Sequence, residues 1–147
     1  MSQFRPVKSG IFIGPQPTPQ DLEDARQHGI KTVIDFRLPS ETATSNETLA
    51  RSAGLDYINI PVNKAMLSAN QIGDLDAAMQ TKQGPFLLHC ATGMRAALLL
   101  ALSTAKKSGW TADQTFAHAK TMGFDLQTSP AYSTFVNQVL KIQRRTQ

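Results

Sequence analysis

Short apolar runs alternate with amphipathic stretches along most of this chain. Four runs of three to six residues are rich in Ile, Val, Leu and Phe, and turn-forming residues separate them. Runs of this length and composition predict buried strands, because a fully covered strand is apolar on both faces. The predicted strands lie at 11–13, 31–36, 57–60 and 86–90.

Helical patterns fill the intervals between these runs. Thr18 followed by Pro19 has the residue types of an N-cap and a first helical position. The spacing from Ser68 to Gln71 fits a capping box, and Thr111 with Gln114 repeats it. The predicted helices lie at about 18–28, 44–53, 72–79, 96–102 and 111–122, with a last one from 129 onward.

Alternating strands and helices predict an α/β fold. Right-handed crossovers then give a mainly parallel sheet of four to five strands with helices on both faces. At 147 residues the chain fits one domain, 1–147, with a helical C-terminal part at about 111–147. Anion sites in such folds lie beyond the carboxyl ends of the strands.

Composition and charge narrow the classes of function. The net charge of +4 comes from scattered basic residues, which does not predict a nucleic-acid partner. No apolar run is long enough to span a bilayer, and the N-terminal residues lack the apolar core of a signal peptide. A single cysteine excludes an internal disulfide and leaves too few thiols for a zinc site. We therefore expect a cytoplasmic protein without metal or cofactor.

The residues at 89–95 carry the chemistry. The only cysteine, Cys90, ends the last predicted strand directly before a helix. The N–H groups at a helix N-terminus favour a thiolate there, and they favour an anion held above it. Arg95 adds a planar fork of donors that matches an oxyanion. The expected anion-binding loop consists of Ala91, Thr92, Gly93 and Met94, with His89 as a support that bonds to the backbone.

The order His-Cys-x-x-Gly-x-Arg resembles the signature of protein-tyrosine and dual-specificity phosphatases. Three upstream segments, 14–18, 29–37 and 54–62, are similar to the phosphatase-like domain of the beta-lactamase-hydrolase-like bacterial proteins. The resemblance covers about 10–108. It implies a dual-specificity-phosphatase-like fold, a phosphate-binding P-loop, Cys90 as nucleophile and Arg95 as anion clamp. It also implies a phosphorylated small molecule or phosphoprotein as substrate.

Three positions depart from that family of phosphatases. Four residues separate Cys90 from Arg95, where such enzymes have five. Ala96 follows the arginine in place of a serine or threonine, and Asn63 stands where an acidic aspartate is expected. A general acid contributes roughly 100- to 10,000-fold to the rate. We therefore expect a slow phosphatase that favours good leaving groups and forms a phosphocysteine.

Two other functions stay open at this point. The short loop is similar in length to that of many rhodaneses, which are sulfurtransferases and would carry a persulfide on Cys90. A non-catalytic anion-binding or redox-sensing module is the other alternative, because an exposed thiolate oxidises readily.

Weaker candidates lie elsewhere in the chain. Arg37 follows the second strand and is expected either to contact the substrate or to pair with Glu41. Four aspartates are alternatives for the general acid, namely Asp74, Asp76, Asp113 and Asp125.

Overall fold

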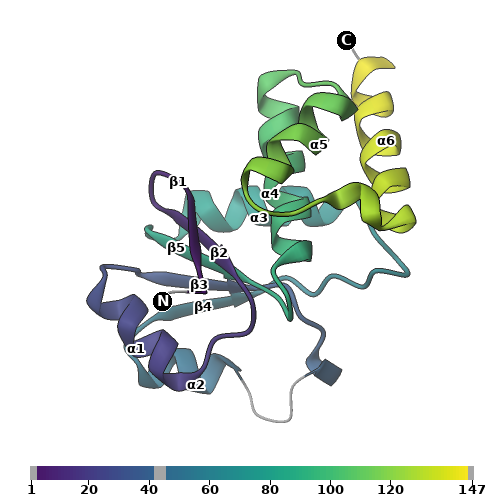
Figure 1. Cartoon of the computed structure of the whole chain (residues 1–147). Coiled ribbons are helices and arrows are strands. Elements are labelled where there is room, and N and C mark those ends of the chain that lie inside the picture. The colour runs from purple at the N-terminus through teal and green to yellow at the C-terminus, as the bar shows by residue number, and fades with distance from the viewer. Residues whose placement is uncertain (1–2, 42–45, 146–147) are drawn as a thin grey trace.

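The computed structural model of the chain describes residues 3–41 and 46–145 (Figure 1). Within these ranges five strands form one sheet: β1 (Arg5–Lys8), β2 (Ile11–Gly14), β3 (Thr32–Asp35), β4 (Asp56–Asn59) and β5 (Phe86–His89). The α-helices are α1 (Pro19–Gln27), α2 (Asn46–Ser52), α3 (Asn70–Thr81), α4 (Met94–Ser108), α5 (Ala112–Thr121) and α6 (Pro130–Arg145). Two short 3₁₀ helices are η1 (Pro39–Glu41) and η2 (Leu126–Thr128). This confirms the predicted α/β class.

The strand order places β5 at the centre of the sheet. The order is β1-β2-β5-β3-β4, with β1 antiparallel to β2 and every other pair parallel. His89 at the end of β5 lies opposite Gly14 of β2 and Asp35 of β3. The carboxyl ends of three parallel strands therefore meet directly before Cys90, where ligands bind in open α/β sheets.

The two faces of the sheet bury different helices. Val33 and Leu87 pack into a cluster with residues of α1 and α2, whereas the next residues along the strands, Ile34 and Leu88, pack against α3, α4 and the C-terminal helices. This alternation follows from the two-residue period of a strand. Figure 1 shows α1 and α2 on one side of the sheet and α3 to α6 on the other.

The edge strand β1 is the element that sequence patterning missed. Its residues are Arg5-Pro6-Val7-Lys8, mostly exposed, and they pair only with β2. An edge strand with a solvent side needs no apolar run, and lysine and proline are frequent at such edges. The hydrophobic pattern therefore carries no signal for this strand.

Helix caps agree with the sequence in most places. Thr18 and Thr111 each form a complete capping box. Ser68 differs, because its hydroxyl accepts from the N–H of Asn70 at 3.2 Å, while the Gln71 side chain accepts from the N–H of Ser68 at 3.2 Å. The predicted helix start at 44–45 lies outside the described residues. Within the described part, no helix is long and apolar enough to cross a membrane.

Candidate active site

Cys90 lies at the start of a tight loop between β5 and α4. Its side chain is 1% exposed, and the N–H of Gly93 donates to its Sγ at 3.0 Å. This N–H and the N-terminus of the fifteen-residue helix α4 beside it direct positive partial charge toward the sulfur. The backbone can turn back on the cysteine in this way because Gly93 has a φ of 101°.

The loop is enclosed by two other parts of the chain. A Cβ on Gly93 would lie 2.7 Å from Cζ of Phe124 and 3.3 Å from the carbonyl oxygen of Gly14. The N–H of Gln16 also donates to the carbonyl of Ala91 at 3.3 Å. Glycine at 93 therefore meets two demands at once, a left-handed φ and a close approach on both sides.

Another loop amide is directed inward to a side chain. The N–H of Met94 donates to Oγ1 of Thr92 at 3.3 Å. With the N–H of Gly93 on sulfur, two of the expected anion-binding amides thus have acceptors inside the loop. The predicted loop residues are together in space, and anion binding by their amides stays a prediction.

Arg95, at the second position of α4, has a fixed orientation. Its Nη1 and Nη2 donate to the two carboxylate oxygens of Glu41 at 2.6 and 2.7 Å, and Nη1 also donates to the carbonyl of Val62 at 3.1 Å. A guanidinium has five N–H donors. Among the described residues, Nε and the second hydrogen of Nη2 have no acceptor, so one edge of the guanidinium is left for an anion.

The pair between Glu41 and Arg95 changes the acidity of both groups. Hydrogen bonds from Arg95 lower the pKa of Glu41, while the Glu41 carboxylate raises the pKa of Arg95. The lowered pKa means that the pair adds stability above the ordinary glutamate value of 4.5. That contribution is lost as the pH falls through the lowered value.

Replacing Glu41 with glutamine is expected to release the Arg95 side chain. The value of kcat/KM for an aryl phosphate should fall about tenfold, because each misplaced charged hydrogen bond weakens transition-state binding. The free energy of unfolding at pH 7 should fall by about 1 kcal/mol or less, since both side chains are partly exposed. The difference in unfolding free energy should shrink below pH 4.5.

A matched control is Glu23→Gln, which breaks the exposed pair with Arg26 at 2.7 Å on α1. Its kcat/KM should equal that of the native chain. Equal kcat/KM for Glu41→Gln and the control would contradict a role for Glu41 in placing Arg95.

His89 is completely buried behind the cysteine. Burial lowers its pKa to about 4, so the ring is neutral at pH 7. The amide Nδ2 of Asn46 donates to Nε2 of His89 at 2.9 Å, which leaves the hydrogen on Nδ1. Nδ1 lies 3.4 Å from the carbonyl of Cys90 and 3.8 Å from Oδ1 of Asp35. The expected backbone contact of His89 is therefore present as a long one.

Arg37 does not pair with Glu41, and this alternative from the sequence is wrong. Its Nε and Nη2 donate to the carboxylate of Asp35 at 3.1 and 3.2 Å, while Glu41 pairs with Arg95. The Tyr57 hydroxyl also donates to Asp35 at 2.7 Å. Burial, followed by that hydrogen bond, raises the pKa of Tyr57. Asp35 thus accepts hydrogen bonds from both Arg37 and Tyr57 in a buried polar group next to His89.

Asn63 and the candidate acids either have structural partners or are exposed away from the cysteine loop. Oδ1 of Asn63 accepts from the N–H of Ala65 at 2.9 Å, which closes a turn. Asp125 caps η2. Asp76 contacts Ser103 and Lys107 in the α3–α4 interface. Asp74 on α3 and Asp113 in the first turn of α5 are exposed. In the described part of the chain, no recorded contact joins these aspartates to 90–95.

Sequence reasoning missed the partners that hold the site together. Asp35, Asn46 and Tyr57 form the group behind His89, and Glu41 holds Arg95. The sequence signal that could have identified Asp35 and Glu41 was their position, because 35–41 begins at the end of β3, the strand that borders β5. Residues 3–41 and 46–145 contain no cluster of His, Cys, Asp and Glu that could hold a metal ion.

Comparison with known proteins decides the family. Residues 3–107 match the profile of a family described as beta-lactamase hydrolase-like protein, phosphatase-like domain. The chain belongs to this family. A beta-lactamase hydrolase-like protein of Xylella fastidiosa is 28% identical over 125 residues, and one of Agrobacterium fabrum is 29% identical over the same length. Each alignment covers 82% of this chain and 29% of the relative, so the chain spans under a third of those proteins.

Solved structures show the same fold. A protein from Neisseria meningitidis has a TM-score of 0.77 at 23% identity, covering 95% of this chain and 99% of that one. TpbA of P. aeruginosa, solved in complex with phosphotyrosine, has a TM-score of 0.76 at 16% identity, covering 98% and 89%. The predicted family and dual-specificity-phosphatase-like fold are thus confirmed. The family is described as a phosphatase-like domain, and these structures share its fold.

Proposed function

We propose that residues 1–147 form one catalytic domain that hydrolyses phosphate esters through a phosphocysteine on Cys90. The observation that supports this most is that one loop combines a hydrogen bond to the cysteine sulfur with an arginine held in place for an anion. The Gly93 N–H lies 3.0 Å from sulfur, and Arg95 is held by Glu41 with one edge of its guanidinium open. A thiolate and an anion clamp at a helix N-terminus suit attack on a phosphate.

In the first step the Cys90 thiolate attacks phosphorus. The S–P bond forms as the P–O bond to the leaving group breaks, and the leaving oxygen takes its proton from water. In the second step water attacks phosphorus, the S–P bond breaks, and phosphate and the thiolate are released. Throughout, the open edge of Arg95 and the loop amides stabilise charge on the non-bridging oxygens. His89 is buried and neutral, so it orients the loop without taking part in proton transfer.

Substrates with good leaving groups suit this site best. Asn63 cannot protonate a leaving oxygen, and its side chain is bound to the backbone of Ala65. A phenolate leaves without an acid far more readily than an alkoxide. We therefore propose a preference for aryl phosphates, such as the phosphotyrosine seen in the TpbA complex.

A parallel assay tests the proposed function. The purified chain is given para-nitrophenyl phosphate, and separately thiosulfate followed by cyanide, since the four-residue spacing within 90–95 also fits a sulfurtransferase. We expect slow release of nitrophenolate and a phosphocysteine adduct on Cys90 in acid-quenched mass spectra. Thiocyanate formation with an added sulfur on Cys90, and no phosphate release, would overturn the phosphatase.

Changing Asn63 to aspartate is expected not to restore acid catalysis. The new carboxylate would accept the same N–H from Ala65, which favours its ionised form. Turnover of an alkyl phosphate should stay within about threefold of the native chain, against the 100- to 10,000-fold that a working acid supplies. Steady-state kinetics with an alkyl and an aryl phosphate measure this, with Asn137→Asp on the exposed side of α6 as the control. A hundredfold rise would show that residue 63 reaches the leaving group.

A further inference from the structure

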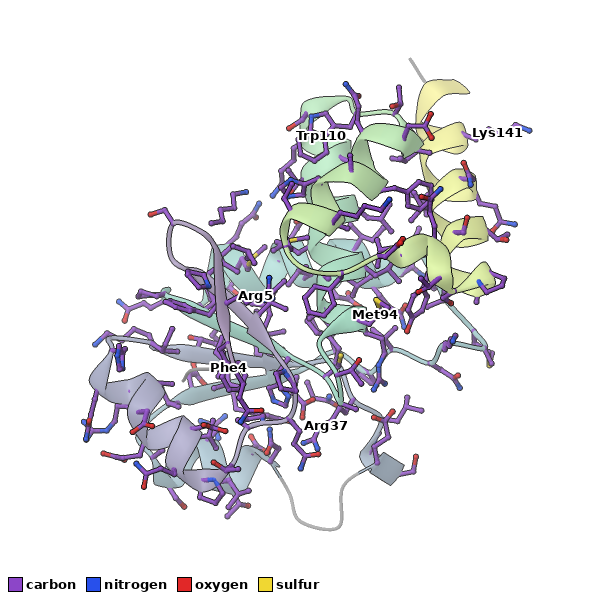
Figure 2. The ribbon with its side chains drawn as sticks, in the orientation of Figure 1. Phe4, Arg5, Arg37, Met94, Trp110 and Lys141 are labelled. Atoms are coloured by element: carbon purple, nitrogen blue, oxygen red, sulfur yellow. The ribbon has the colours of Figure 1, made fainter. Side chains whose placement is uncertain are left out.

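A cavity of about 330 Å³ lies beside the cysteine loop, and the mechanism above does not use it. Its polar lining consists of Asp35, Arg37, Asn46, Glu47, Tyr57 and Asn59. These residues come from the ends of β3 and β4 and from the start of α2. Figure 2 shows Arg37 at the end of the sheet from which α4 departs, the end that also carries Met94.

Arg37 supplies the feature that points to a ligand. The side chain is 1% exposed, and its Nη1 has no hydrogen-bond partner within 3–41 and 46–145. The other two nitrogens of the guanidinium are bound to Asp35. A buried charged donor without an acceptor is unfavourable, and native proteins have few of them. A hydrogen-bond acceptor that enters the cavity would give the Nη1 of this guanidinium a partner.

The cavity shares a chain segment with the catalytic loop. Asp35 lies opposite His89 in the sheet, and the N–H of Phe36 donates to the carbonyl of His89 at 2.9 Å. Six residues after Asp35, Glu41 holds Arg95. The segment that lines the cavity after β3 is therefore also the segment that contacts the end of β5 and holds Arg95.

The charges around the cavity favour a neutral ligand group. Asp35 offsets Arg37, and Glu47 is paired with Arg51 at 3.0 Å. An additional phosphate or carboxylate would face both of the acidic side chains. A neutral carbonyl oxygen can accept from Arg37 without that repulsion.

The lining also offers acceptors. The side-chain nitrogen of Asn59 donates hydrogen bonds to the backbone carbonyls of Asp35 and Arg37, at 2.7 and 3.0 Å. No donor to the side-chain oxygens of Asn46 or Asn59 is recorded among the described residues. A carboxamide brings both a carbonyl for Arg37 and an N–H for such an oxygen, so it matches the cavity better than an alkyl or a charged group.

We propose that this cavity is the subsite for the leaving-group side of the substrate and that it selects a carboxamide on the chain that extends from the aryl ring, opposite the phosphate. The proposal rests on the proposed phosphatase function, because it places the phosphate over Cys90. Arg37 is then a specificity-determining residue that binds the part of the substrate remote from phosphorus.

Binding to the Cys90→Ser variant tests the subsite without turnover. Calorimetry at pH 7 compares the O-phosphate of N-acetyltyrosinamide with 4-propylphenyl phosphate, whose aryl rings carry similar leaving oxygens. We expect the carboxamide compound to bind about tenfold tighter, the usual effect of one charge-assisted hydrogen bond. In Cys90→Ser/Arg37→Lys the two compounds should bind equally, since lysine can pair with Asp35 but lacks the second arm of the guanidinium.

The matched control is Cys90→Ser/Arg51→Lys, which changes an exposed arginine paired with the lining residue Glu47 and should keep the tenfold preference. Equal affinities in Cys90→Ser, or no binding of either compound, would overturn the subsite, and neither result depends on Arg37→Lys folding. A preference in binding with no hydrolysis of either compound by the native chain would instead overturn the proposed function alone.

Discussion

Replacement of Cys90 by serine is expected to lower hydrolysis of para-nitrophenyl phosphate at least about 1,000-fold, the usual result of removing a nucleophile. A serine hydroxyl stays protonated at neutral pH, and His89 is not placed to take its proton, because that ring is buried and its nitrogens face Asn46 and the backbone. The serine oxygen can still accept the N–H of Gly93. The loop should therefore keep its shape and still bind phosphate.

Two measurements separate loss of chemistry from loss of structure. Calorimetry with phosphate should show affinity close to that of the native chain, and the free energy of unfolding should change by about 1 kcal/mol. Thr81→Ser, at the end of α3, serves as a control for a comparably small change far from the loop. Residual activity within tenfold of the native chain would contradict Cys90 as nucleophile.

Changing Arg95 to lysine is expected to lower kcat/KM for an aryl phosphate by about 100- to 1,000-fold, the range seen when a donor to a developing oxyanion is removed. The native side chain binds Glu41 and the Val62 carbonyl with one edge and keeps Nε free for an anion. A lysine ammonium is a single point charge and is drawn to Glu41, so it cannot do both.

The control for this change is Arg26→Lys, because Arg26 also pairs with a glutamate at 2.7 Å but lies on exposed α1. It should leave kcat/KM unchanged. If Arg95→Lys kept more than a tenth of the native kcat/KM, the clamp would have to be supplied by the loop amides instead.

Much of the fold was predictable because buried strands and capped helices leave local signals. The apolar runs predicted the three inner strands and the edge strand β4, and Thr18 and Thr111 marked helix starts by residue type alone. β1 left no signal because its residues are exposed and its pairing to β2 is a tertiary event. The predicted capping box at Ser68 is incomplete, because its hydroxyl accepts from the N–H of Asn70, while the N–H of Gln71 donates to the backbone carbonyl of Ser68.

The residues of the site were likewise predictable where they are neighbours in sequence and unpredictable where they are distant. The cluster at 89–95 is contiguous in sequence, so its residue types and spacing could be recognised from the sequence. The partner of Arg95 was not, because Glu41 is 54 residues away and only the strand order brings 35–41 beside the loop. From the sequence, Arg37 was expected to contact the substrate or to pair with Glu41, and the structure instead pairs it with Asp35, two residues earlier in the chain.

The position of Phe124 matters when the limits of such a domain are chosen for truncation or for transfer into another protein. Its ring lies where a side chain at Gly93 would be, yet it stands beyond the stretch that defines the family, which ends at 107. A protein engineer who trimmed the chain at that limit would keep every signature residue and remove one wall of the loop. The end of the family match is therefore not the end of the segment that encloses the loop, and grafts should carry the chain through η2.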